Sequence, residues 1–194
     1  MENTKKITRK MFFAHQYEKE EKYLSGMRKK GWKFIGVHMA FPTKYEFEAC
    51  EPEDYSYQLD YLKKEEDTED YHQMLQDAGW EEVGNYPGLY DGRWYYFCKK
   101  KENQKEEQLY TDVTSKMDLM KKLKQTYGLF FAAMFCCEIG AFNNLLGQLA
   151  EGRTSWGVVV TTAFCAFALL LFLYNIIGLF SISSKLKKEN KGRL

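Results

Sequence analysis

Two long apolar segments dominate the pattern of hydrophobic and polar positions, and both lie in the last third of the chain. Residues 127–149 carry one charge in 23 positions, and residues 156–182 carry none in 27. About 20 apolar residues are enough to cross the hydrocarbon core of a bilayer, so each segment predicts a membrane-spanning helix. A buried helical hairpin is the alternative, but a small domain could hardly cover the second segment on every side.

The short loop between the segments predicts a helical hairpin with both ends on one side of the membrane. Lysines precede the first segment and basic residues follow the second, whereas the loop over residues 150–155 has Arg153 as its one basic residue. The positive-inside rule therefore places both termini in the cytoplasm. The basic start of the chain is not followed by an apolar stretch, so no cleaved signal peptide is expected. These features predict a multi-pass protein of the plasma membrane.

The first hundred residues contain a repeated pattern. Residues 11–50 align with residues 59–98 without a gap, and seven of the 40 positions are identical. Chance would give roughly two or three identities at ordinary residue frequencies. The identities include two Gly-Trp pairs that mark equivalent places in the copies, namely Gly31, Trp32, Gly79 and Trp80.

Each copy predicts a strand, a helix and a two-stranded hairpin, in that order. The first strands are expected at residues 10–15 and 55–62, where apolar or aromatic residues recur. A helix with one apolar stripe follows in each copy and ends at a Gly-Trp pair, because glycine suits the left-handed position after a helix. We therefore predict an α+β fold in which two helices cover a six-stranded, largely antiparallel sheet, followed by the two-helix transmembrane hairpin.

Changes in composition divide the chain into four predicted parts. They are a cytoplasmic duplicated domain over 1–100, with copies at about 10–52 and 55–100; a polar linker and amphipathic juxtamembrane helix over 101–125; a transmembrane hairpin over 126–184; and a basic cytoplasmic tail over 185–194. The juxtamembrane helix is expected either to lie on the inner leaflet or to run straight into the first span.

The duplicated domain resembles a known family, the domain of unknown function 2812, over about residues 10–100. The paired Gly-Trp steps are the most specific part of this resemblance, and further matching residues are Glu21, Leu24, Met27, Tyr45, Glu46, Phe47, Glu48, Tyr55, Tyr57, Asp60, Tyr61, Tyr71, Leu75, Ala78, Glu81, Tyr95, Tyr96 and Phe97. The resemblance implies a membrane-associated protein of Gram-positive bacteria, often encoded near PadR-type transcription regulators. It implies no catalytic residues, since the family has no established activity.

Charge is balanced over the whole chain but uneven along it. The 194 residues include 28 Lys and Arg against 27 Asp and Glu, yet residues 45–91 hold 15 acidic residues against Lys63 and Lys64, a net charge near −13. A nucleic-acid-binding protein presents a continuous basic face, so direct binding to nucleic acid is not expected. A solvated acidic surface is the simpler interpretation of this stretch, and a binding site is the alternative.

A candidate binding site lies in the N-terminal part of the acidic stretch. Carboxylates beside aromatic rings suit a lipophilic cation, through charge pairing and cation–π contact. We predict that the open face of the sheet forms such a cleft, lined by Glu46, Glu48, Tyr45, Tyr55, Tyr57 and Tyr61.

Signals for catalysis and for cofactors are weak. The three histidines have no metal-ligand spacing, and the sequence contains no nucleophile elbow, phosphate loop or dinucleotide fingerprint. The five cysteines form no C-x-x-C pair, and a cytoplasmic domain keeps its thiols reduced. We therefore predict no catalytic residues, no metal site and no cofactor.

Polar residues inside the first apolar segment need an explanation. Glu138 lies within the predicted span, where a carboxylate costs on the order of 2.5–3.5 kcal/mol on insertion scales, and Asn143 and Asn144 follow it. One interpretation is a protonated Glu138 bonded within the hairpin, to Thr161 or Thr162, or to a second copy. The other is an intramembrane site for a partner such as a transporter subunit. A stripe of small residues suited to close helix packing lies on the other side of the same helix, at Ala132, Cys136 and Gly140.

The sequence as a whole predicts a membrane-anchored cytoplasmic sensor or adaptor that binds a ligand or a protein. A protein-docking regulatory subunit of a membrane complex is the alternative, and an enzyme comes third. Expected partners are the lipid bilayer, a small lipophilic or cationic ligand, and a membrane protein or a second copy of the chain. A concave aromatic pocket would favour the small ligand, and a flat patch with a polar rim would favour a protein.

Overall fold

The computed structural model describes residues 5–38, 40–89, 92–101 and 113–191. The chain divides into two compact units, Met1–Leu119 and Met120–Leu194. The predicted polar linker lies largely outside the described residues, as does the end of the predicted basic tail.

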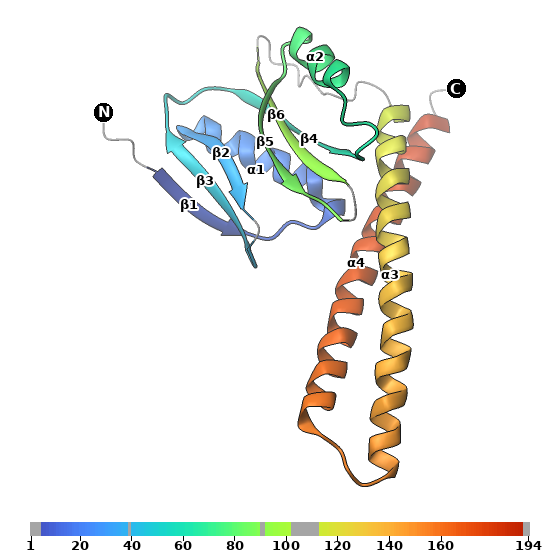
Figure 1. Cartoon of the computed structure of the whole chain (residues 1–194). Helices are drawn as coiled ribbons and strands as arrows, with labels where there is room; N and C mark the ends of the chain where they lie inside the picture. Colours follow the sequence, from blue (N-terminus) through green and yellow to red (C-terminus); the bar gives the residue numbers. More distant parts are fainter. Residues whose placement is uncertain (1–4, 39, 90–91, 102–112, 192–194) are drawn as a thin grey trace. The chain divides into compact units, whose positions relative to one another are not determined.

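The first unit contains two halves with one topology. Each half has a three-stranded antiparallel sheet, with its last strand in the centre and the other two strands at the edges (Figure 1). The first half comprises β1 (Lys5–Lys10), a short 3-10 helix η1 (Ala14–Gln16), α1 (Tyr17–Lys29), β2 (Trp32–His38) and β3 (Thr43–Ala49). The second half comprises β4 (Tyr55–Leu62), α2 (Glu69–Asp77), β5 (Glu81–Pro87) and β6 (Arg93–Lys100).

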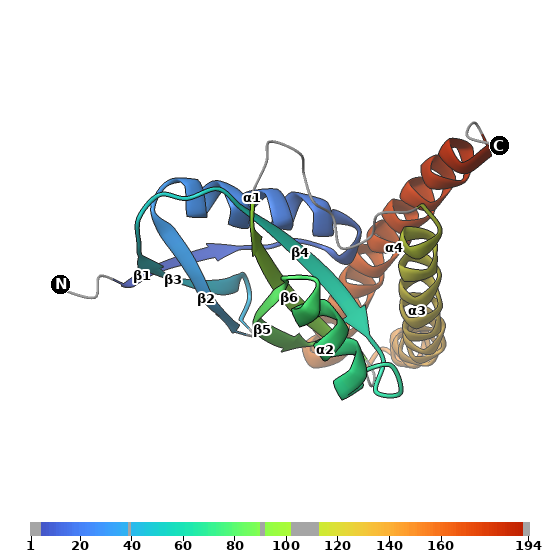
Figure 2. The ribbon, with the colours of Figure 1, turned by 90° about the horizontal axis from the view of Figure 1, so that it is seen from above.

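The predicted α+β class is confirmed, but the strands form two sheets and not one of six strands. Their orders are β1-β3-β2 and β4-β6-β5. The outer edge of β4 is covered by α1, which lies beside it in Figure 2, and not by another strand. The N–H of Leu59 donates to Glu21 Oε1 at 2.9 Å, and the N–H of Tyr57 donates to Ser25 Oγ at 3.3 Å. Side chains of α1 therefore accept hydrogen bonds from backbone N–H groups of β4 that a neighbouring strand would otherwise bind.

The first strand begins five residues earlier than predicted. Residues 5–10 form β1, whereas residues 14–16 form η1. Because β1 is an edge strand with mostly exposed side chains, it lacks the apolar alternation that indicates a buried strand. The aromatic residues that suggested a strand pack against the core instead, as Phe12 does against Tyr23 and Tyr45, with ring centroids 5.8 and 6.2 Å apart.

The two Gly-Trp pairs occupy the equivalent positions that the repeat predicts. Gly31 has φ +79° and Gly79 has φ +81°, each just after a helix. A Cβ on Gly31 would lie 2.9 Å from the carbonyl oxygen of Cys50, so both the backbone angle and the space require glycine there.

A β-bulge is also repeated at the same spacing. It lies between Phe34 and Gly36 in β2 and between Glu82 and Gly84 in β5, so the two bulges are 48 residues apart. The second hairpin is longer, because Phe34 pairs with Phe47 whereas Glu82 pairs with Phe97. The ungapped alignment is therefore correct from the end of the helix through the bulge and shifted by two residues in the last strand. It is shifted by four residues in the first strand, because Phe47 pairs with Lys6 and Phe97 pairs with Gln58.

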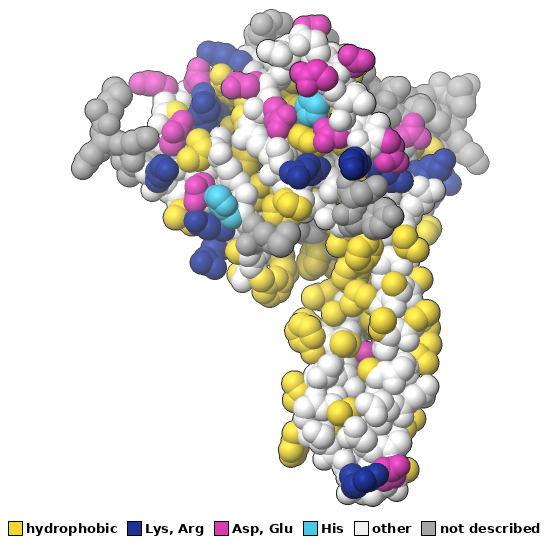
Figure 3. Space-filling model, viewed as in Figure 1, with side chains coloured by type: hydrophobic (Ala, Val, Ile, Leu, Met, Phe, Trp, Pro, Cys, Tyr) yellow, Lys and Arg dark blue, Asp and Glu magenta, His cyan; other side chains and the backbone are white. Residues whose placement is uncertain are grey.

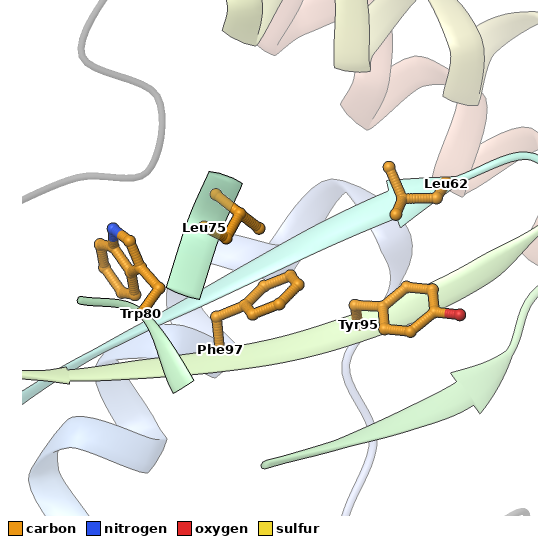
Figure 4. Packing of buried hydrophobic residues seen from close by; sticks show 5 residues of the cluster. All are labelled: Leu62, Leu75, Trp80, Tyr95 and Phe97. Atoms are coloured by element: carbon orange, nitrogen blue, oxygen red, sulfur yellow. The ribbon is translucent and has the colours of Figure 1, made fainter. Parts of the chain in front are cut away.

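Two strands of the second sheet, β4 and β6, are largely buried on both faces. On one face, Leu75 of α2 packs over side chains of the sheet and of the turn before β5, in a cluster that contains Leu62, Leu75, Trp80, Tyr95 and Phe97 (Figure 4). On the other face, Tyr96 lies 5.2 Å from Phe34 of β2, measured between ring centroids, and links the two halves.

The second unit consists mainly of two long helices, α3 (Val113–Ala150) and α4 (Trp156–Lys191). Both are long and apolar enough to cross a membrane. Because α3 begins at Val113, the predicted juxtamembrane helix runs straight into the first apolar segment. Hydrophobic side chains are spread along the surface of the hairpin in Figure 3, and Phe164 is 70% exposed.

Candidate functional site

The tyrosines of the predicted cleft lie mainly in the interior. Tyr45 is 2% exposed, and its hydroxyl donates to Glu20 Oε1 at 2.7 Å. Tyr57 and Tyr61 are buried in β4, and the Tyr61 hydroxyl donates to the Leu89 carbonyl at 2.7 Å. Tyr55 lies under the guanidinium of Arg28, whose central carbon is 4.4 Å from the ring centroid. These rings already have protein partners and do not line one open surface.

The two glutamates of the predicted cleft lie on the opposite face of β3 from Tyr45. Glu46 accepts a hydrogen bond from Lys44 Nζ at 2.7 Å and lies 3.4 Å from His38 Nε2, and these contacts hold the pKa of its carboxyl below the usual value. Glu48 pairs in register with Lys5 and Lys33 on the neighbouring strands. The outer face of the first sheet is therefore of mixed charge, and the six residues are not brought together.

The structure places a buried carboxylate between the two halves, at Glu20 of α1. Its Oε1 accepts hydrogen bonds from the hydroxyls of Tyr45 and Tyr96, both at 2.7 Å. Burial raises the pKa of Glu20, and the two tyrosine hydrogen bonds offset part of that increase. Burial, with the Glu20 charge, also raises the pKa of each tyrosine. These two hydrogen bonds link α1 to one strand of each sheet, β3 and β6.

A second buried carboxylate follows directly at Glu21. Burial raises its pKa to about 8, against the opposing effect of the hydrogen bond from the Leu59 N–H. Neither glutamate was predicted to be buried, although their spacing held the signal: positions 17, 20, 21, 24 and 27 lie on one face of a helix. All five are buried in α1. Glutamate on an apolar stripe therefore indicated a buried polar contact.

Polar contacts also link α2 to the second sheet. His72 lies between two carboxylates, with Nε2 2.8 Å from Asp67 Oδ1 and Nδ1 3.2 Å from Glu82 Oε2. The Tyr95 hydroxyl donates to the other oxygen of Asp67 at 2.7 Å. Burial alone would raise the pKa of Asp67, but the hydrogen bonds from His72 and Tyr95 outweigh it and lower that pKa.

The histidines lie in separate places. His15 stacks on Phe13, with ring centroids 6.0 Å apart, whereas His38 and His72 contact the carboxylates already described. Within the described ranges, no group of three or more His, Cys, Asp or Glu side chains is placed to hold a metal ion.

The polar residues of the first apolar segment lie on different sides of α3. Partly or fully covered positions follow steps of three and four along both helices, the spacing of a coiled-coil seam, at Tyr127, Phe131, Met134, Glu138, Ala141 and Leu145 of α3 and at Thr162, Cys165, Leu169, Phe172, Ile176 and Leu179 of α4. Asn143 and Asn144 are exposed, as is the stripe of small residues. Glu138 thus lies on the seam, and the asparagines and the stripe lie outside it.

The environment of Glu138 bears on both interpretations of that residue. Its Oε2 atom is buried and has no hydrogen-bond partner among the described residues. The Thr161 hydroxyl donates to the Gly157 carbonyl at 2.8 Å. Thr162 is buried on α4. The bonds predicted to either threonine are therefore not seen for this oxygen.

Comparison with known proteins identifies one family. A family model described as a protein of unknown function, DUF2812, matches residues 16–132, which is more than half of the chain. The match runs from the start of α1 into α3. No curated protein and no solved structure matches the chain.

Proposed function

The chain belongs to the DUF2812 family, and we propose that it is a membrane-anchored adaptor whose cytoplasmic domain docks a partner protein. The α3–α4 hairpin supplies the anchor, and the duplicated domain supplies the docking surface. Binding without catalysis is part of the proposal.

The exposed apolar surface of the hairpin is the observation that carries the proposal. Large side chains such as Leu129, Phe164 and Leu170 are more than half exposed on helices long enough to span a bilayer. Leaving such a side chain in water forgoes about 1.5–3 kcal/mol relative to burial, and a lipid environment removes that cost for every one of them. The basic residues at both ends of the hairpin favour cytoplasmic termini at the plasma membrane.

Protein docking accounts for the domain better than capture of a small ligand. The tyrosines expected to hold a lipophilic cation are buried or already covered by other side chains. By contrast, acidic side chains gather over the α2 part of the domain in Figure 3. The exposed acidic residues of α2 and β5 are Glu69, Asp70, Asp77, Glu81 and Glu82. Met74, which is 55% exposed, lies on α2 four residues after Asp70 and three before Asp77. A basic segment of a partner suits this surface, because complementary charge accelerates encounter and sets specificity.

The proposal is tested by photo-crosslinking in cells, with the crosslinking amino acid in place of Met74. The matched control carries it in place of Ile7, which is 56% exposed on the other half. We expect a protein adduct from position 74, absent from position 7 and lost when Asp70 and Asp77 are both changed to Lys.

Two results would contradict protein docking at this surface. One is the absence of an adduct from position 74 while the chain is membrane-bound, and the other is an adduct that survives the charge reversal. Thermal stabilisation of the chain by a lipophilic cation in that case would favour a small-ligand sensor. An adduct with a subunit of a membrane complex would identify a regulatory subunit, and an adduct with the chain itself would identify a homo-oligomer.

A further inference from the structure

We propose that one end of the first sheet binds the anionic headgroups of the membrane in which the hairpin is anchored. The binding surface, here called the tip patch, is formed by Arg9, Lys10, Met11, His38, Phe41 and Lys44. The inference rests on the proposed function, because it requires the hairpin to be embedded and the domain to face the inner leaflet.

The strand register brings the tip patch together from two segments. Arg9 pairs with Lys44 and Lys10 pairs with Thr43, so the end of β1 lies beside the connection between β2 and β3. His38 pairs with Lys44 from the other side. Met11, which follows β1, therefore lies at the same end of the sheet as this connection.

Two apolar side chains project from this end. Phe41 is 77% exposed in the connection between β2 and β3, and Met11 is 41% exposed after β1. They are too few to form the core of a stable protein interface, which buries about 800 Å² on each partner. An aromatic ring on a turn, flanked by basic side chains, instead suits insertion at the level of lipid headgroups.

The charge around the exposed ring is basic. Arg9 and Lys10 are exposed, and Lys44 is half-buried beside them. The carboxylate that faces this group belongs to Glu46, which is already paired with Lys44 and His38. An anionic surface would therefore meet cations with little opposing charge.

The net charges of the two halves favour the same orientation of the domain, with the tip patch toward the membrane. Residues 1–49, which contain the first half, hold 11 Lys and Arg against six Glu, a net charge of +5, whereas residues 55–100, the second half, hold five Lys and Arg against ten Asp and Glu, a net charge of −5. A leaflet that contains anionic lipid attracts the first half and repels the second. The tip patch thus turns toward the membrane, and the acidic surface around α2 turns toward the cytoplasm.

Hydrogen–deuterium exchange of the full chain in lipid nanodiscs tests this inference. Nanodiscs of phosphatidylcholine alone are compared with nanodiscs of equal parts phosphatidylcholine and phosphatidylglycerol. We expect the amides of residues 40–44 to exchange more slowly in the anionic nanodiscs, and high salt to abolish the difference. Each basic side chain removed, as in Arg9→Gln and Lys10→Gln, should weaken the lipid-bound state roughly fivefold. The variant Phe41→Ser should also reduce the protection.

Matched controls lie in the acidic half. Met74→Ser removes an apolar side chain of comparable exposure, and Lys63→Gln removes a basic one; neither should change the lipid-dependent protection of the tip. Equal exchange at the tip in both lipids, with the amides of α3 and α4 protected, would overturn the lipid inference and leave the anchor intact. Rapid exchange along α3 and α4 in the nanodiscs would overturn the anchor, and the inference with it.

Discussion

Raising the pH from about 5 to about 8 should destabilise the duplicated domain, because Glu21 is buried in its protonated form. The ordinary pKa of a glutamate side chain is 4.5, and burial raises that of Glu21 to about 8. Between these values the folded chain holds a proton that the unfolded chain has lost. The stability that this carboxyl contributes is therefore fully present below pH 4.5 and is lost as the pH rises to 8.

The size of the effect follows from the one proton that Glu21 holds in the folded chain and has lost in the unfolded chain. Each pH unit within the window removes about 1.4 kcal/mol, so the free energy of unfolding should fall by roughly 4 kcal/mol between pH 5 and pH 8. Burial also raises the pKa of Glu20, which adds to the loss. Carboxyls whose pKa values are lowered, such as those of Glu53 and Asp54, titrate below this window and do not oppose it.

Equilibrium unfolding in urea measures the effect directly. The full chain in detergent micelles reports on the domain through the fluorescence of Trp32, Trp80 and Trp94. In Glu21→Gln the amide oxygen still accepts the Leu59 N–H but does not titrate, so the pH dependence should flatten. Glu81→Gln, at an exposed glutamate on β5, is the matched control and should keep the original slope. A free energy of unfolding that rises from pH 5 to pH 8, or an unchanged slope in Glu21→Gln, would refute the reasoning.

Three further predictions concern stability and use the same unfolding assay. Gly31→Ala should cost about 1–3 kcal/mol, because the backbone is left-handed and the added Cβ clashes, whereas Gly26→Ala within α1 should be neutral or stabilising by up to about 1 kcal/mol. Leu75→Ala should cost about 2–5 kcal/mol by opening a cavity under α2, and its exposed neighbour Met74→Ala should cost less than about 0.5 kcal/mol. Thr68→Ala should cost about 0.5–2 kcal/mol, because its hydroxyl caps the N-terminus of α2. Equal losses within either pair, or none at Thr68, would contradict these assignments.

The order of elements was predictable because local signals mark it. The Gly-Trp pairs end helices in both halves, and a two-stranded hairpin follows each pair. The strand β1 was misplaced because an exposed edge strand needs no apolar alternation. The pattern of apolar and polar residues also could not predict the division into two sheets, because this division depends on Glu21 and Ser25, whose side chains cover the edge of β4. Contacts between residues more than 30 positions apart leave no local periodicity.

The candidate cleft shows a different limit. Alternation along a strand puts Tyr45 and Glu46 on opposite faces, but it does not say which face is buried. Tyrosines were predicted to line an open cleft, whereas the hydroxyls of Tyr45 and Tyr96 donate to the carboxylate of Glu20 in the interior. A buried glutamate on α1 made those tyrosines core residues. The two apolar segments, by contrast, could be identified directly from the sequence, because their lengths match the thickness of a bilayer.

The membrane anchor is the central claim, and cysteine labelling in intact cells tests it most directly. The five native cysteines are replaced by alanine, and single cysteines are introduced as Arg153→Cys in the loop of the hairpin and Met74→Cys in the domain. A maleimide that cannot cross membranes should label position 153 in intact cells and position 74 only after permeabilisation. Labelling of position 74 in intact cells, or recovery of the chain in the soluble fraction, would contradict an embedded hairpin with a cytoplasmic domain.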